Sequence, residues 1–159
     1  MLRSYLNRFL RDNAGSALVE FALSAVLLVM VLFGIIECCF ALYINNYVSD
    51  AARNAARYAV VRGSGCSGMP DCGITSAGIQ TYLRSTAYPG ITPGNLTATA
   101  TWLSLNPGPP ATWTVCANQC NAPENSVRVQ VNYAFTLAIP FWRSKSITLS
   151  STSQMVISN

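Results

Sequence analysis

A long apolar stretch near the N-terminus dominates the pattern of hydrophobic and polar positions. Apolar residues run from Phe21 to Ile36 and resume after Glu37, and the whole segment 17–44 contains 28 residues. As a helix this segment is about 42 Å long, which exceeds the roughly 30 Å thickness of a bilayer's hydrocarbon core. We therefore expect it to span a membrane with some tilt.

The same helix is expected to continue beyond the membrane. No proline occurs between Ser16 and Arg62, and Gly34 is the only glycine in that range. The sequence Gly-Ser-Gly at 63–65 is a typical stop signal for a helix. The pattern thus predicts one helix of about 47 residues, or about 70 Å, over 16–62.

A stripe of small side chains marks the outer part of this helix. Ala51, Ala55 and Ala59 recur every four residues, and Ala52 and Ala56 flank them. Small side chains on one face let another backbone approach closely. Two interpretations remain open here, because the stripe can pack on the chain's own head or on another subunit.

The polar and apolar pattern changes after residue 63, where Gly, Pro, Ser, Thr and Asn become frequent. The segment 74–87 is predicted to be a short helix. Alternating apolar and polar positions predict strands over 96–103 and 127–135, and a last strand over 146–157. A long helix followed by a small antiparallel sheet makes the expected fold class α+β.

Four cysteines lie in this second part of the chain, namely Cys66, Cys72, Cys116 and Cys120. An even number of cysteines in an exported segment indicates disulfides. Sequence permits three pairings, and we favour Cys66–Cys72 with Cys116–Cys120 because each pair brackets one short loop. A four-thiolate zinc site is the alternative, but its spacing fits zinc ribbons poorly.

Composition and charge exclude several functions. Only 10% of residues are charged, and the net charge of +4 comes from basic residues that form no run able to follow a phosphate backbone. Histidine is absent, and the carboxylates outside the leader and membrane segment are Asp50, Asp71 and Glu124. We expect no enzymatic activity, no cofactor or metal, and no nucleic-acid binding.

The first fifteen residues form a basic leader. It contains three basic residues, Arg3, Arg8 and Arg11, and one acidic residue, Asp12. This excess of positive charge favours a cytoplasmic N-terminus. An ordinary secretory signal peptide is the alternative, but the apolar run is longer than such signals and no A-x-A site directly follows it. A lipoprotein signal is also disfavoured, because Glu37 precedes Cys38 where a small residue is expected.

A lone acid lies just inside the start of the apolar helix. Gly15 ends the leader, and Glu20 follows five residues later. A carboxylate in a membrane helix costs about 2.5–3.5 kcal/mol on insertion scales, so it normally has a partner. If the chain is cut after Gly15, the new amine of Ser16 supplies a cation for Glu20 of the same or a neighbouring chain. Glu37, by contrast, lies either at the outer membrane boundary or in a buried pair across subunits.

The sequence G-S-A-L-V-E resembles the type IV prepilin cleavage motif. The resemblance implies that a prepilin peptidase cuts after Gly15, that Ser16 is the first mature residue, and that Glu20 is the fifth and guides docking. The runs V-E-F-A-L, F-G-I-I-E and A-A-R-N-A-A-R-Y-A between residues 19 and 59 look like TadE-like proteins. These are minor pilins or pseudopilins of the tight-adherence (Flp) pilus systems of bacteria. Many family members carry a proline early in the membrane helix. This chain has Ala25 at about that position, so we expect no proline kink here.

The resemblance implies a structural subunit for assembly of a Tad/Flp pilus used in adherence. Its expected partners are the prepilin peptidase, the major and other minor pilins, the inner-membrane platform and the assembly ATPase. The chain would divide into a cleaved leader 1–15, a transmembrane helix 16–44, a periplasmic continuation 45–62 and a head 63–159. The protein would cross the bacterial inner membrane once, with a periplasmic head that can also enter an extracellular pilus.

A different class of function remains as the alternative. The head can act as a binding or adhesion module, with the helix as a plain membrane anchor. The aromatic side chains that would form such a surface are Trp102, Trp113, Phe141 and Trp142. Packing in the core is the competing interpretation of these residues.

Overall fold

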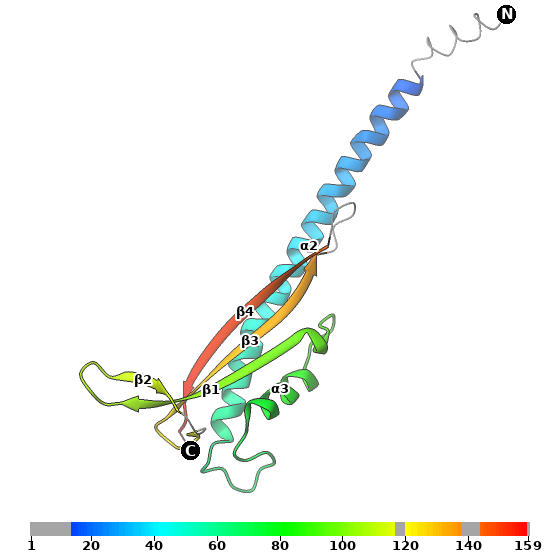
Figure 1. Ribbon diagram of the computed structural model, residues 1–159. Helices are drawn as coiled ribbons and strands as arrows, with labels where there is room; N and C mark the ends of the chain where they lie inside the picture. The colour runs from blue at the N-terminus through cyan, green and yellow to red at the C-terminus, as the bar shows by residue number, and fades with distance from the viewer. Residues whose placement is uncertain (1–13, 117–119, 138–143, 159) are drawn as a thin grey trace, which may run out of the picture.

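The structure, a computed structural model, describes residues 14–116, 120–137 and 144–158. Its elements are α2 (Ala14–Val61), α3 (Ser76–Ser85), the 3-10 helix η1 (Pro93–Asn95), β1 (Leu96–Asn106), β2 (Thr112–Val115), β3 (Ser126–Leu137) and β4 (Lys145–Val156). Figure 1 shows α2 as a rod whose N-terminal part projects from a small head. The four strands form one antiparallel sheet in the order β2-β1-β3-β4. The predicted α+β class is confirmed.

The C-terminal half of α2 is part of the core of the head. One face of this half is buried, and it packs mainly on β3 and β4. The buried residues of this face are Ile44, Tyr47, Val48, Ala51, Ala52, Ala55, Ala56 and Ala59. The alanine stripe therefore packs on the chain's own sheet, the first of the two interpretations. Its small side chains allow the helix backbone to lie close to the strands.

Strand β3 supplies the other side of this core. Its odd-numbered side chains face α2 and are almost completely buried: Val127, Val129, Val131, Tyr133 and Phe135. The even-numbered Arg128 and Gln130 face solvent on the opposite side of the sheet. Burying a valine contributes about 1.5–3 kcal/mol, so this strand is a major source of stability for the head. The alternation that predicted the strand is confirmed.

Helix α3 covers β1 on the same side of the sheet, so the head has two layers. Thr75 caps its N-terminus, with the side chain accepting a hydrogen bond from Gly78 N. Ile79 and Leu83, one turn apart, are its buried residues. The helix is shorter than the predicted 74–87 because this cap starts it later and Thr86 ends it.

Strand β2 was not predicted from the sequence. It pairs with the end of β1, from Leu103↔Val115 to Asn106↔Thr112, and extends β1 beyond the predicted residue 103. Only Trp113 in β2 is partly covered, and the alternation of Thr with Trp and Val extends over only four residues, which is a short signal for a strand. Trp102 is a core residue, only 5% exposed, whereas the predicted platform residues Phe141 and Trp142 lie outside the described residues.

Two disulfides fasten the end of the head farthest from the projecting helix. Cys66 is bonded to Cys72 and Cys116 to Cys120, the pairing that the loop lengths favoured. Asn121 ties the two loops together. Its carbonyl oxygen accepts hydrogen bonds from Ser64 N at 2.9 Å and Ser64 Oγ at 3.1 Å, and its Nδ2 donates to Ile74 O at 3.4 Å.

We predict that Ala55→Leu destabilises the head. Ala55 is fully buried between α2 and the sheet, so a larger side chain must push the helix away, at a cost of about 1–3 kcal/mol. Arg53→Leu on the exposed side of the helix is the matched control. Denaturant unfolding of the full chain in detergent measures both, and equal stability of the two variants would contradict the close packing described here.

Candidate functional site

The N-terminal part of α2 lies outside the head and is exposed on all sides. Leu18 is 71% exposed and Phe21 is 74% exposed, and apolar side chains continue in this way to Ile36. By length and composition, α2 is the one helix in the described part of the chain that could cross a membrane. A run of large exposed apolar residues needs a lipid or protein environment.

Gly15 and Ser16 lie in the first turn of this projecting helix. A Cβ atom added to Gly15 would meet no other atom within 4 Å, and its backbone is helical. Glycine inside a helix costs about 0.5–1 kcal/mol relative to alanine. Neither packing nor backbone conformation therefore explains why glycine stands at this position.

Glu20 lies one turn after Ser16, on the exposed surface of α2. Among the described residues the only ion pair is between Arg53 and Asp50, at 3.7 Å, so Glu20 has no cationic partner there. A carboxylate at such a place in a membrane helix needs a partner from another group. The arrangement thus leaves Glu20 available to a cation outside the described part of the chain.

Glu37 occupies a different face of α2. It lies four residues before Ala41 and seven before Ile44, so it continues the stripe that enters the core of the head. Its side chain is half-buried, in contrast to the exposed Glu20. The segment 17–36 before it, apolar except for Glu20 and Ser24, has 20 residues, about 30 Å of helix, which is the thickness of a hydrocarbon core. This length favours the membrane-boundary interpretation of Glu37.

The head begins to contact α2 just after Glu37. The Phe40 ring meets the Phe135 ring edge-on, with centroids 5.7 Å apart. Tyr43 Oη donates a hydrogen bond to Pro89 O at 3.2 Å. Gly90 has a φ of +82° and would place a Cβ 3.8 Å from the Phe40 ring, so its left-handed backbone conformation favours glycine. These contacts hold the near end of the head to the helix without a flexible linker.

The structure separates the predicted site residues into two groups. Gly15, Ser16 and Glu20 lie together on the projecting end, whereas the stripe from Ala51 to Ala59 is inside the head. Along a helix axis, Glu20 and Ala51 are about 46 Å apart. The alanines therefore belong to the fold, and the first three residues form the candidate processing and assembly site.

Comparison with known families identifies this N-terminal segment. Residues 15–57 match the family model described as TadE-like protein. The chain is TadE-like over this segment. The match covers 43 of the 159 residues, all of them in α2. No curated protein and no solved structure matches the chain.

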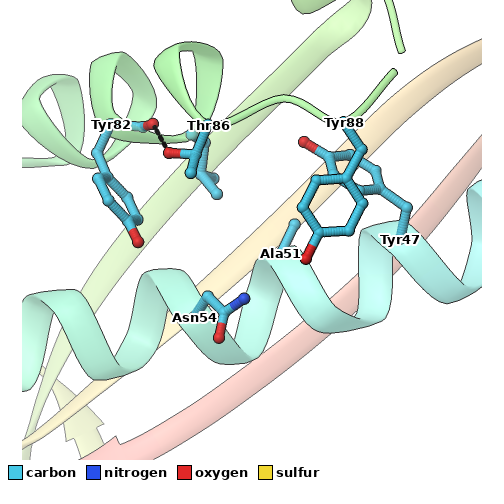
Figure 2. Close-up of a pocket in the computed structure, with 7 residues that line it drawn as sticks. Tyr47, Ala51, Asn54, Tyr82, Thr86 and Tyr88 are labelled. Atoms are coloured by element: carbon cyan, nitrogen blue, oxygen red, sulfur yellow. Dashed lines mark hydrogen bonds between the residues drawn. The ribbon is translucent and has the colours of Figure 1, made fainter. Parts of the chain in front are cut away.

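A small tyrosine-lined pocket lies where the TadE-like helix meets α3. Its lining residues are Tyr47, Ala51, Asn54, Tyr82, Leu83, Thr86 and Tyr88. Figure 2 shows Tyr82 and Tyr88 reaching from the α3 side towards α2, with Asn54 below them. The Tyr47 and Tyr88 rings have centroids 5.0 Å apart. Sequence reasoning missed this pocket because its residues come from distant segments, although the four-residue spacing of Tyr43 and Tyr47 marks that flank of α2.

A stack of side chains lies on the other side of Tyr82 and fixes the first disulfide loop. The Tyr58 and Tyr82 rings are stacked at 3.8 Å, and the Arg62 guanidinium lies 3.6 Å from the Tyr58 ring centroid. Tyr58 Oη donates to Asp71 Oδ2 at 3.2 Å, and Arg62 Nε donates to Pro70 O at 3.2 Å. Burial and, secondly, the hydrogen bond to Asp71 raise the pKa of Tyr58 above its usual value. Both faces of the Tyr58 ring are occupied, so this stack is structural.

Burial raises the pKa of Tyr47 above the ordinary tyrosine value, and the nearby Tyr88, Tyr43 and Tyr133 act in the same direction. A raised folded-state pKa means that the neutral phenol stabilises the head fully below about pH 10. We predict that this contribution is lost as the pH rises above that value. Because no hydrogen bond of the Tyr47 hydroxyl is present among the described residues, Tyr47→Phe should retain the fold and lose stability less steeply above pH 10. Unfolding free energies measured between pH 8 and 11 test this, and identical slopes for the two proteins would contradict it.

Proposed function

We propose that this TadE-like chain is a minor pilin or pseudopilin, a structural subunit that a prepilin peptidase processes and that assembles through its N-terminal helix. The observation that carries the proposal is the projecting apolar end of α2, which presents Glu20 four residues after Ser16. The peptidase trims the leader after Gly15, and the helix then holds the subunit in the inner membrane until assembly. The head lies in the periplasm, and no catalytic role is proposed.

The electrostatics of Glu20 support this proposal. Cleavage after Gly15 creates a cationic amine on Ser16, close to the depth at which Glu20 lies. In a medium of low dielectric constant the attraction between two opposite charges is far stronger than in water. An amine of one subunit and the Glu20 carboxylate of its neighbour thus favour side-by-side packing of two helices in one orientation. The major pilin, other minor pilins and the inner-membrane assembly platform are the proposed partners.

The absence of a structural reason for Gly15 supports the proposed processing. A Cβ at this position meets nothing within 4 Å beyond the adjacent backbone of its own helix, so packing does not require a glycine there. A peptidase that must bind the backbone closely at the scissile bond does favour glycine. Gly34 offers an internal comparison, because a Cβ there also meets nothing within 4 Å.

An anchored binding module is the second candidate function. The observation that favours it is the tyrosine-lined pocket between α2 and α3, because tyrosine is enriched at binding surfaces. In this case α2 serves only as an anchor, and the charge at Glu20 has no function. The two candidates therefore differ in what they expect of Glu20.

We predict that Gly15→Leu blocks removal of the leader. The larger side chain prevents close approach of the peptidase, while the helix itself tolerates leucine. Intact mass and N-terminal sequencing of the protein from its native membrane should then show the uncut chain, whereas the wild type starts at Ser16. Gly34→Leu is the matched control and should be cut normally. A wild-type chain that starts beyond Cys39 would contradict the proposal.

We predict that Glu20→Gln lowers pilus production at least about tenfold while cleavage and membrane level stay unchanged. The variant loses a charged hydrogen bond of about 1.5–3 kcal/mol but keeps the shape of the side chain. Glu20→Asp retains the charge and should lose less. Sheared pili are quantified from cells that carry each variant as the only copy, and full production by Glu20→Gln would favour the anchored binding module.

A further inference from the structure

The backbone groups that point outward from β1 and from β4 differ in whether they have hydrogen-bond partners. On the β1 edge, side chains of α3 occupy the outward backbone groups. Ala98 N donates to Gln80 Oε1 at 3.0 Å, Ala100 N donates to Ser76 Oγ at 3.1 Å, and Gln80 Nε2 donates to Leu96 O at 3.2 Å. Farther along, β2 covers the rest of β1. The outward groups of β1 are therefore occupied, and the four-residue strand β2 is the outer strand on this side.

The register identifies which groups of β4 point to its free edge. In an antiparallel sheet, the N–H and C=O of one residue both point to the strand on one side, and those of the next residue both point to the other side. Because Ala98 and Ala100 point outward, Thr99 points to β3, where its partner is Gln130. Odd-numbered residues of β3 then bond to β4, and Ser151 is the partner of Val131. The residues of β4 whose backbone groups face outward are consequently Ser146, Thr148, Ser150, Thr152, Gln154 and Val156.

Nothing in the described part of the chain hydrogen-bonds to these outward groups. The strand has 12 residues, Lys145–Val156, with no proline and with Lys145 as its only charge. Its register with β3 is continuous from Ser126↔Val156 to Leu137↔Lys145, so no bulge interrupts it. Natural proteins normally protect a long edge strand with charges, proline, bulges or a covering segment. Among the residues that the structure describes, side chains of α3 protect β1 in this way, and no such group covers β4.

We propose that the free edge of β4 binds an extended segment of a different polypeptide chain, which adds to the sheet as a fifth strand. The row of alternating backbone donors and acceptors is complementary to another extended backbone and to no other common ligand. The residues of β4 whose backbone groups face the edge are mostly Ser and Thr. Their side chains add little contact area, so the backbone hydrogen bonds provide most of the binding.

A second copy of this chain fits the edge poorly. Figure 1 shows β4 running alongside α2, so an antiparallel two-fold pair of β4 strands would send the two N-terminal helices in opposite directions. Subunits anchored in one membrane exclude that arrangement. A two-fold axis parallel to the strands would place identical backbone groups opposite each other, donor against donor. Gln80 and Ser76 block pairing with β1 of a copy, and β2, the other outer strand, has only four residues to pair with the 12 of β4.

The argument against a second copy rests on the proposed function, because it assumes that the subunits share one membrane. The open edge of β4 does not depend on that function, since it follows from the hydrogen bonds and register of the sheet. Hydrogen exchange of the purified full chain in detergent tests the edge by itself. Outward amides, such as those of Ser150 and Thr152, should exchange much faster than the inward amide of Ser151. Equal protection of outward and inward amides would overturn the proposal, whatever the outcome for Glu20.

The partner is tested in pilus-producing cells with a photoreactive benzoylphenylalanine at Thr148. The same group at Thr99, on the same polar side of the sheet but on β1, is the control. We expect a cross-link to a different chain from position 148 and none from position 99, with the attachment point found by mass spectrometry. A cross-link to a second copy of this chain, or none from position 148, would overturn the proposal.

Two variants separate backbone pairing from a side-chain contact. Ser150→Pro removes an outward N–H, a change that edge strands tolerate, and should abolish the cross-link from position 148. Ser150→Ala removes only the hydroxyl and should retain it. Thr152→Pro serves if Ser150→Pro does not fold, as judged by thermal unfolding. Persistence of the cross-link in a folded proline variant would overturn backbone pairing.

Discussion

The contact between the alanine face of α2 and the valine face of β3 is the interaction on which the rest of the structure depends. It joins the head to the second half of a helix whose first half exposes apolar side chains on every side, with Glu20 among them. Because the helix is continuous from Ala14 to Val61, the head has no freedom to rotate away from the projecting segment. The position of one determines the position of the other.

This rigid connection explains why the two halves of α2 carry different residues. In the head, Ala and Val side chains allow a close approach of helix and sheet, and their burial replaces contact with water. In the projecting half, large apolar side chains remain exposed and are suited to lipid. Glu37 lies between these environments, and its side chain is half-buried. Its place at this change of environment accords with the 30 Å of apolar helix that precedes it.

The head is held together by disulfides and side-chain contacts at its far end, whereas the edge of β4 has no such contacts among the described residues. The two disulfides and Asn121 fix the far end, and the stack of Arg62 on Tyr58 and Tyr82 fixes the loop after α2. Helix α3 covers β1 and also supplies the side chains that close its edge. No comparable device lies along β4 in the described residues. A chain whose α3 occupies the outward groups of β1, while the 12 residues of β4 stay uncovered, is suited to strand addition at β4.

Much of this molecule follows from its sequence, because its strongest signals are periodic and local. The long helix follows from a continuous apolar run and a glycine stop, and strand β3 follows from the burial of every second residue. The loop lengths favoured the disulfide pairing, and a lone acid after a glycine indicated the candidate site. Tertiary structure alone decided that the alanine stripe faces the chain's own sheet, since periodicity shows that a face is buried but not what covers it. It also decided the β2 hairpin, which lacks a buried face, and the tyrosine pocket, whose residues meet only after α2 and α3 pack together. The difference between the two sheet edges has the same origin, because strand order and side-chain caps depend on contacts between segments distant in sequence.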